Sequence, residues 1–154
     1  MKRIAIGLCI LAVSFGLIFA AGHLSATGEL FLENLRIGRT YHVKDLGKDL
    51  FKISNNSDRE LELTIEPVLP EKSLLRKGYK SLPSARWIKT DVDKLKLSPG
   101  QVGLIDVIIS IPREKKYIGK KYQFHIWSKT APVKGSGVKV ATGIESIFRI
   151  TIAK

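Results

Sequence analysis

The sequence predicts an all-β protein, an antiparallel β-sandwich of seven to nine strands that follows an N-terminal hydrophobic helix. Apolar and polar residues alternate with period two from about residue 50 to the C-terminus, which is typical of half-buried strands. Clusters of Asn, Asp, Ser, Pro and Gly separate these runs, as turns would. After residue 22, no long segment has apolar residues at helical spacing.

Residues 1–26 are expected to be a signal peptide or a membrane anchor, and residues 27–154 the folded domain. Met-Lys-Arg precedes an uncharged apolar run at 4–22, and a basic start before an apolar core is the secretory pattern. Cleavage after Gly22 or Ala26 would release the domain. As a helix, the run would span about 28 Å, close to the hydrocarbon thickness of a bilayer, so a retained anchor is the alternative. Either way, the domain is expected to be periplasmic or secreted.

Two strands are especially clear. In 60–66, the apolar residues Leu61, Leu63 and Ile65 share one face and the glutamates share the other, as in an antiparallel strand with one wet face. In 102–111, every odd-numbered residue from Ile105 to Ile111 is apolar, and Pro112 ends the run. Further strands are predicted at residues 30–32, 40–43, 50–53, 87–89, 94–97, 122–127 and 144–152.

Two longer loops connect the predicted strands. Residues 67–86 contain three prolines and are expected to form a loop with one short helical turn near 72–76, and residues 129–143 are rich in Gly and Lys. Many short strands and no second domain boundary are typical of one immunoglobulin-like sandwich. A small closed barrel is the alternative.

The order of turns and strands resembles a known layout. The sequence reads LFKISNNSD at 50–58, LKLSPGQ at 95–101, VIISIP at 107–112 and GKKY at 119–122. This resembles extracytoplasmic immunoglobulin-like modules of bacteria and archaea, including those similar to pilus-chaperone and major-sperm-protein folds. The resemblance covers about residues 50–127. Because it rests on turn chemistry and core alternation, it implies a fold and no activity.

The residue types for catalysis or metal binding do not come together in the sequence. His23, His42 and His125 have no partners at metal-ligand spacing, and the two strand histidines are expected to be exposed. Cys9 lies in the apolar run, so the domain has no thiol. No nucleophile-elbow, zinc-protease or phosphate-loop motif occurs. We therefore expect no enzymatic activity, no cofactor and no metal.

Two tryptophans receive different expectations. Trp87 follows the proline-containing loop and is expected to lie in the core. Trp127 alternates outward from Phe124 and Ile126, and residues 129–143 are expected to cover it.

The charge balance indicates the kind of partner. The chain has 26 Lys and Arg against 14 Asp and Glu, a formal net charge of +12. Such an excess favours an anionic polymer, anionic lipid head groups or an acidic protein, and a generally basic solvated surface is the alternative. No nucleic acid is expected, because aromatic residues do not interleave with the basic ones.

The candidate binding residues lie in the two longer loops. If every predicted strand crosses the sandwich once, 67–86, 98–101 and 129–143 share one end, and 55–60, 90–94 and 112–121 share the other. The candidates are the basic residues Lys72, Arg76, Lys77, Lys80, Arg86, Lys129, Lys134 and Lys139.

These observations together predict a function class. We expect an exported, non-catalytic binding or structural module of the cell envelope that acts through basic loops. One alternative is an assembly chaperone that receives a subunit's strand at an exposed sheet edge. Another is a membrane-tethered accessory subunit of an envelope complex.

Overall fold

The computed structural model describes residues 23–46, 51–130 and 143–154, so the hydrophobic helix predicted at the N-terminus lies outside the described residues. The strands are β1 (Leu24–Ala26), β2 (Glu29–Leu35), β3 (Arg39–His42), β4 (Phe51–Asn55), β5 (Leu61–Val68), β6 (Lys80–Ser81), β7 (Ile88–Thr90), β8 (Lys94–Leu97), β9 (Val102–Ile105), β10 (Val107–Ile111), β11 (Lys121–Thr130) and β12 (Gly143–Ile152). Four single-turn 3-10 helices are η1 (Val43–Leu46), η2 (Lys72–Leu74), η3 (Ala85–Trp87) and η4 (Lys115–Tyr117). None of the helices in this part of the chain is long and apolar enough to cross a membrane.

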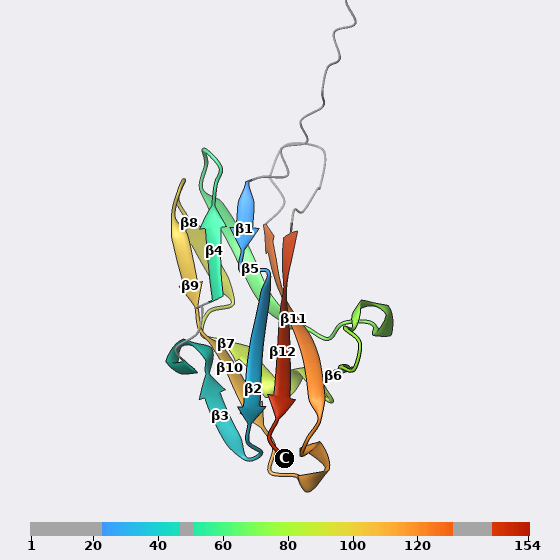
Figure 1. Ribbon diagram of the computed structural model, residues 1–154. Helices are drawn as coiled ribbons and strands as arrows, with labels where there is room; N and C mark the ends of the chain where they lie inside the picture. The colour runs from blue at the N-terminus through green and yellow to red at the C-terminus, as the bar shows by residue number, and fades with distance from the viewer. Residues whose placement is uncertain (1–22, 47–50, 131–142) are drawn as a thin grey trace, which may run out of the picture.

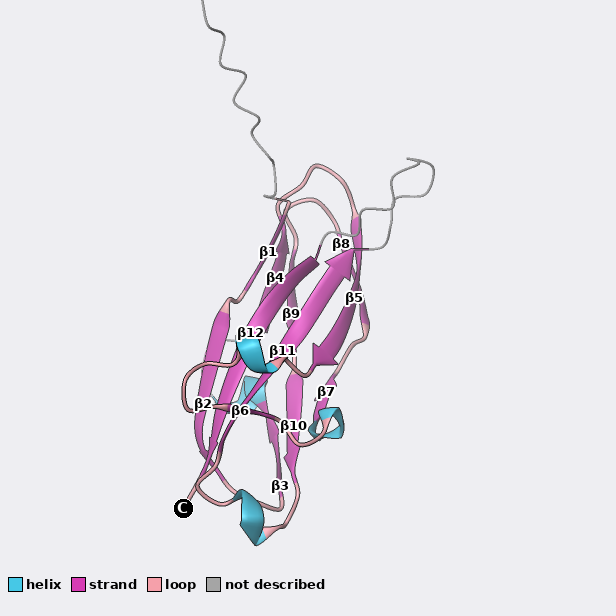
Figure 2. Cartoon of the chain, turned by 90° about the vertical axis from the view of Figure 1, so that its right-hand side faces the viewer, coloured by secondary structure: helices cyan, strands magenta, loops and turns pink. Residues whose placement is uncertain are grey.

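The strands form a sandwich of two layers (Figure 1). One sheet has the order β2-β12-β11-β5-β8, and the short β6 pairs with the start of β11. The other layer consists of two three-stranded groups, β1-β4-β9 and β3-β10-β7. Neighbouring strands are antiparallel except β2 with β12 and β6 with β11. The C-terminus lies at one end of the elongated molecule, and the β4–β5 and β8–β9 turns lie at the other (Figures 1 and 2).

The core lies between the two layers and consists of the apolar faces that alternation predicts. Phe51 of β4 and Phe124 of β11 both contact Phe148 of β12, with ring centroids 5.6 and 4.9 Å apart. All three rings are fully buried. Trp87 is also in the core, as expected, against Tyr117 and Tyr122. Aromatic pairs of this kind add to the free energy of burial, which is the main stabilising contribution in a domain without a disulfide.

The all-β prediction is confirmed, and each predicted strand overlaps an observed one. Two short strands were missed. β1 has three residues, and its partner β4 is far away in sequence; β6 has two. The predicted strand 102–111 is interrupted at Asp106, which separates β9 from β10.

Candidate protein-binding edge

The structure separates the predicted basic residues. Lys72, Arg76, Lys77 and Lys80 are exposed on the segment that runs beside the start of β11, where Lys80 pairs with Tyr122. Lys129 lies seven residues after Tyr122 on β11, which places it about 23 Å from Tyr122 at ~3.3 Å per residue. Its ammonium is 2.6 Å from a carboxylate oxygen of Glu66. Arg86 lies in η3, which packs against β10 of the other layer. Lys134 and Lys139 lie outside the described residues.

The predicted grouping of loops at the two ends is wrong for 55–60 and for 67–86. Residues 67–86 begin at the Val68 end of β5, whereas 98–101 follows Leu97, which lies opposite Leu61 at the other end. The turns 55–60 and 98–101 lie at the same end, because the Gly100 N–H donates to the Asn55 carbonyl and the Asn55 N–H donates to the Gln101 carbonyl. β7 and β8 run in the same direction and are two halves of one crossing, since β7 pairs antiparallel with β10 and β8 pairs antiparallel with β5. Counting each half as a full crossing inverted the assignment of both loops that precede it, 55–60 and 67–86. A binding role for the eight residues stays a prediction.

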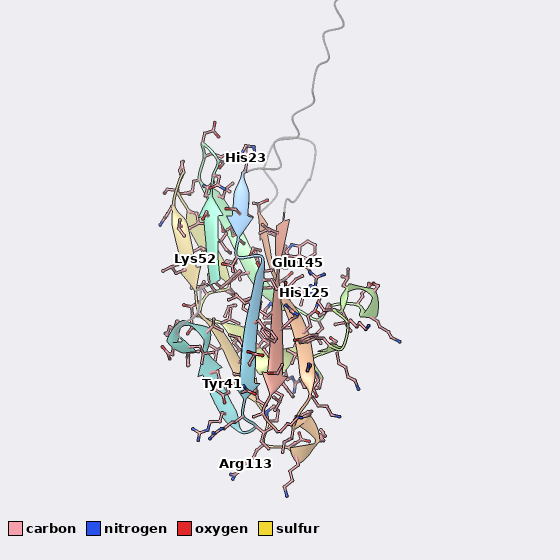
Figure 3. The ribbon with its side chains drawn as sticks, in the orientation of Figure 1. His23, Tyr41, Lys52, Arg113, His125 and Glu145 are labelled. Atoms are coloured by element: carbon pink, nitrogen blue, oxygen red, sulfur yellow. The ribbon has the colours of Figure 1, made fainter. Side chains whose placement is uncertain are left out.

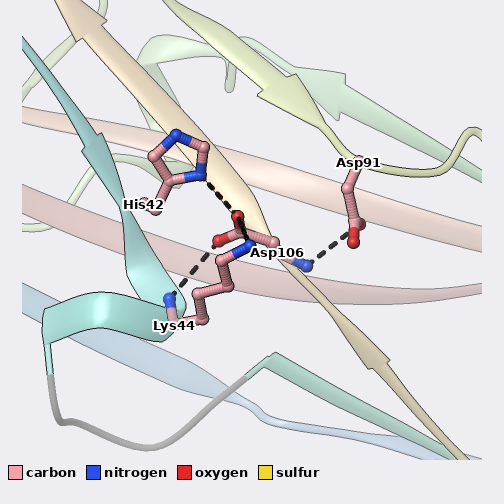
Figure 4. Close-up of polar contacts among 4 residues, drawn as sticks. All are labelled: His42, Lys44, Asp91 and Asp106. Carbon is pink, nitrogen blue, oxygen red and sulfur yellow. Dashed lines mark hydrogen bonds and ion pairs between the residues drawn. The ribbon is translucent and has the colours of Figure 1, made fainter.

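The chain between β7 and β8 changes from one sheet to the other beside a buried carboxylate, that of Asp106, which lies between β9 and β10 (Figure 4). Asp106 is 4% exposed, and its Oδ2 lies 2.6 Å from Nδ1 of His42 and 3.4 Å from Nζ of Lys44. The Lys44 backbone N–H donates to Oδ1 at 3.3 Å. Burial raises the pKa of Asp106, but the hydrogen bonds from His42 and Lys44 outweigh it and hold the pKa below its usual range. The carboxylate therefore ties the end of β3 and the start of η1 to the β9–β10 junction.

Asp91 completes this junction on the opposite side of Asp106 (Figure 4). The Asp91 N–H donates to the Asp106 carbonyl, and the Asp106 N–H donates to Oδ1 of Asp91, both at 3.0 Å. Two residues later the chain has left this layer, because the Asp93 carbonyl accepts from the N–H of Ile65 in the other sheet. β7 therefore pairs with β10, but the hydrogen bonds on this side of the strand end at Asp106 and do not continue along β9.

β9 is consequently an open edge. The backbone groups of alternate residues in a strand point to the same side, so those of Leu104 and Val102 point the same way as those of Asp106. Among the described strands, β9 pairs only with β4, on its other side. The N–H and C=O groups of Val102 and Leu104 are therefore available to a further strand.

The side chains beside this edge are apolar and exposed. Val102 is 50% and Leu104 is 56% exposed, and both lie on the outer face of the layer. Leu104 is opposite Lys52 of β4, which Figure 3 labels on this face. β8 belongs to the other sheet, and its exposed Lys94 and Lys96 lie on the outer face of that sheet, opposite Thr64 and Glu62 of β5. An open edge with alternating apolar side chains suits main-chain pairing with an apolar strand, and Lys52 favours an acidic residue on that strand.

The opposite layer carries a second polar cluster, on β11. The Gln123 Nε2 lies 2.7 Å from His125 Nε2, and His125 Nδ1 lies 2.7 Å from a carboxylate oxygen of Glu145 (Figure 3). Gln123 also accepts from the Arg76 N–H and donates to the Leu74 carbonyl. The segment around η2 therefore covers this face, and Gln123 and His125 are buried.

The sequence reasoning missed both histidine–carboxylate pairs. His125 is 2% exposed rather than exposed as expected, and the His42 side chain is 40% exposed. The partners are 64 and 20 residues away, and strand pairing brings them together, so spacing along the sequence gave no signal. Trp127 is 41% exposed, and most of the segment expected to cover it lies outside the described residues. In the described ranges, no group of three or more His, Cys, Asp or Glu side chains could hold a metal ion.

The arrangement of strands defines the class of protein. A search of solved structures finds the ASH/PapD-like domain 7 of human CEP192 with a TM-score of 0.59 at 8% identity, covering 99% of both chains. The class 5 fimbriae chaperone CfaA matches with a TM-score of 0.52 at 9% identity, over 85% of this chain and 57% of that one. The periplasmic chaperone SfaE matches with 0.50 at 8%, over 82% and 57%.

The chain thus has the PapD-like, immunoglobulin-like fold, and it spans just over half the length of these two chaperones. At such identities the likeness concerns the fold alone. No protein-family model and no curated protein sequence matches this chain.

Proposed function

We propose that this protein is a non-catalytic, extracytoplasmic binding module that takes a strand of a protein partner onto the open edge of β9. The observation that carries this proposal is the pair Val102 and Leu104, exposed at alternate positions on a strand whose outer backbone groups have no strand partner among the described residues. Strand addition at such an edge derives affinity from main-chain hydrogen bonds and specificity from alternate side chains. The partner strand would present apolar residues to Val102 and Leu104 and an acidic one toward Lys52.

The proposed location rests on the N-terminal sequence. Lys2 and Arg3 followed by the apolar run 4–22 support export, and a retained run would tether the domain to the membrane. The fold is also that of periplasmic chaperones such as SfaE, which agrees with export.

The high positive charge should speed the first association with an acidic partner. A net charge of +12 attracts acidic proteins and anionic surfaces over several ångströms, and it raises association rates more than it raises affinity. The eight candidate basic residues would contribute to this attraction collectively. Association should therefore slow as salt shortens the Debye length to about 8 Å at physiological ionic strength.

The fold favours one specific form of the proposal, an assembly chaperone. CfaA and SfaE are chaperones by name, and this chain shares the fold of part of each. A chaperone would release its partner on assembly, whereas an accessory subunit of an envelope complex would stay bound to it. Extraction separates the tethered form: detergent releases a protein held by residues 4–22, and high salt releases one held by charge.

The experiment that tests strand addition uses a photo-crosslinking amino acid at position 104 in the native envelope. Leu74 serves as the matched control position, because it is 53% exposed and distant from β9 in the fold. We expect one protein adduct at 104 that is absent at 74, identified by mass spectrometry. With that protein purified, the pair V102D/L104D should weaken binding by about tenfold or more, and the matched pair L74D/I118D should not. Equal adducts at both positions, or equal affinities of the two variants, would contradict strand addition at β9.

A further inference from the structure

A pocket of about 720 Å³ lies at the end of the molecule that carries the C-terminus, away from β9. Three segments line it: the β2–β3 turn at 36–39, the β10–β11 connection through Arg113 and Ile118, and Ala153 with Lys154 after β12. Four of the lining residues are basic, and none is acidic. We infer that this pocket binds a small phosphate monoester through Arg36, Arg39 and Arg113.

Backbone hydrogen bonds tie the three segments together. The Gly38 N–H donates to the Ile111 carbonyl at 2.8 Å, which holds the turn against the end of β10. The Ala153 N–H donates to the Leu35 carbonyl, also at 2.8 Å, and the Gly119 N–H donates to the Ala153 carbonyl at 3.3 Å. The walls of the pocket are therefore parts of the sandwich and not independent loops.

Contacts of Gly38 and Tyr41 hold Arg113 and the backbone of Arg36 in place at the pocket. Gly38 has φ of +69°, and a Cβ at this position would lie 3.1 Å from both Cβ and Cγ of Arg113. The aliphatic part of Arg113 thus packs directly on the turn that carries Arg36 and Arg39. The Arg36 N–H donates to the Tyr41 hydroxyl at 2.7 Å, which holds the start of the same turn. Figure 3 labels Arg113 and Tyr41 at this end.

These basic residues have no neutralising partner among the described acidic side chains. Other basic residues are paired: Arg149 with Glu29, Lys116 with Glu114 and Lys129 with Glu66. No ion pair to a described Asp or Glu is found for Arg36, Arg39, Arg113 or Lys154. Like charges gathered around one pocket repel each other, and a bound dianion would relieve that repulsion.

The side-chain types select the ligand class. A guanidinium offers two parallel N–H donors that match phosphate oxygens, which the point charge of an ammonium does not. Three such groups favour a dianion over a single carboxylate. The volume exceeds that of a bare phosphate, and Ile37 and Ile118 supply apolar wall for the carbon part of an ester. The ester could be free or could be the phosphomonoester head group of a lipid, since both present the same chemistry.

The test measures binding by the purified full-length protein and its variants in two arms. Calorimetry with glycerol 3-phosphate, with glycerol as the uncharged control, reports a free ester, and co-sedimentation with vesicles containing phosphatidic acid reports a head group. The pair R39Q/R113Q should weaken binding by about tenfold or more. The pair R39K/R113K should weaken it less but measurably, because lysine keeps the positive charge and lacks the paired N–H donors of the guanidinium. The matched pair K115Q/K120Q removes the same charge at the same end without touching the pocket.

Saturable binding in either arm that follows this order of variants supports the site, and the arm in which it occurs identifies the source of the phosphate. Equal losses from the arginine pair and the lysine pair would overturn the inference, because they would indicate attraction to a basic end and no site. Absence of saturable binding in both arms would also overturn it.

Discussion

Asp106 shows how one residue determines where an edge opens. Its side chain accepts from His42 and from Lys44, and its backbone makes both final hydrogen bonds to Asp91. Beyond it, β9 continues without a partner on that side among the described strands. The carboxylate is buried and satisfied, so its removal leaves donors without an acceptor.

Asp106→Asn should lower the free energy of unfolding at pH 7 by about 1–3 kcal/mol, because a charged acceptor of two side chains is lost. The folded-state pKa of Asp106 lies below its usual value, so this contribution is fully present above the unfolded pKa and is lost as pH falls through the folded pKa. The difference between wild type and variant should therefore shrink in acid.

Urea unfolding between pH 7 and pH 2 measures this difference. Asp58→Asn, at an exposed turn position, is the control and should change stability little at any pH. A difference that stays constant down to the lowest pH would contradict the assignment of the pKa.

At the scale of the element, β11 shows how an outward-facing polar residue becomes buried. Gln123 points away from the core, yet it is fully buried because its amide bonds the backbone of Leu74 and Arg76. Gln123 thus holds the segment 69–79 on the face of the sheet together with Tyr79, whose ring centroid lies 6.5 Å from that of Phe31. Leu74 itself is 53% exposed.

Gln123→Ala should release this segment and lower the free energy of unfolding by about 1–3 kcal/mol, because buried backbone groups lose their partner. Hydrogen exchange should increase at the amide of Arg76, and the rest of β11 should keep its protection. Gln101→Ala is the matched control: its Oε1 also accepts a backbone N–H, from Ser98, but at an exposed turn. Equal costs for the two substitutions would show that burial of Gln123 does not matter.

The sequence was sufficient for the longer strands but not for the short β1 and β6 or for the places where strands change partner. Alternation located 60–66 and 102–111, because each has one face in the core. It could not show that 88–90 and 94–97 are halves of one crossing, since the change of sheet depends on backbone bonds from Asp91 and Asp93 to distant residues. The open edge of β9 follows from that change, and so the candidate edge could not be predicted.

The same limit applies to the basic residues. The count of charges predicted binding residues in the lysine-rich loops 67–86 and 129–143. The arginines without an acidic partner lie instead in the turn at 36–39 and at Arg113. They meet only because β3 and β2 place the turn beside the end of β10. Nothing in their spacing along the sequence indicates this proximity.

At the scale of the whole molecule, the N-terminal strands connect both layers. β1 pairs with β4 in one layer, and two residues later β2 begins to pair with β12 in the other. The Thr27 N–H donates to the Lys52 carbonyl and the Ile147 N–H donates to the Gly28 carbonyl, so the crossing itself is hydrogen-bonded to both layers. Residues 23–26 are therefore part of the fold.

The domain 23–154 should fold as a cooperative β unit in the presence of reductant and chelator, because aromatic and aliphatic side chains make up most of its described core. The fragment 27–154, which lacks β1, should keep a β-type circular dichroism spectrum but melt several degrees lower, since β4 loses its pairing partner on that side. Thermal melts of the two fragments under identical conditions test this. Equal melting temperatures would mean that β1 does not contribute, and a helical spectrum would contradict the fold.

The parallel pairing of β2 with β12 also has a mechanical consequence. β2 leads away from the N-terminal end and β12 leads to the C-terminus, and their parallel ladder runs from Glu29 opposite Ile147 to Leu35 opposite Ile152. Tension applied between the two ends of the domain would pull these strands past each other, so all the hydrogen bonds of the ladder bear the load together. In a hairpin pulled from its open end, by contrast, the bonds break one after another. A domain tethered at residue 23 and stretched from residue 154 should therefore resist force until the ladder shears in one step, which single-molecule stretching would record as one high-force event.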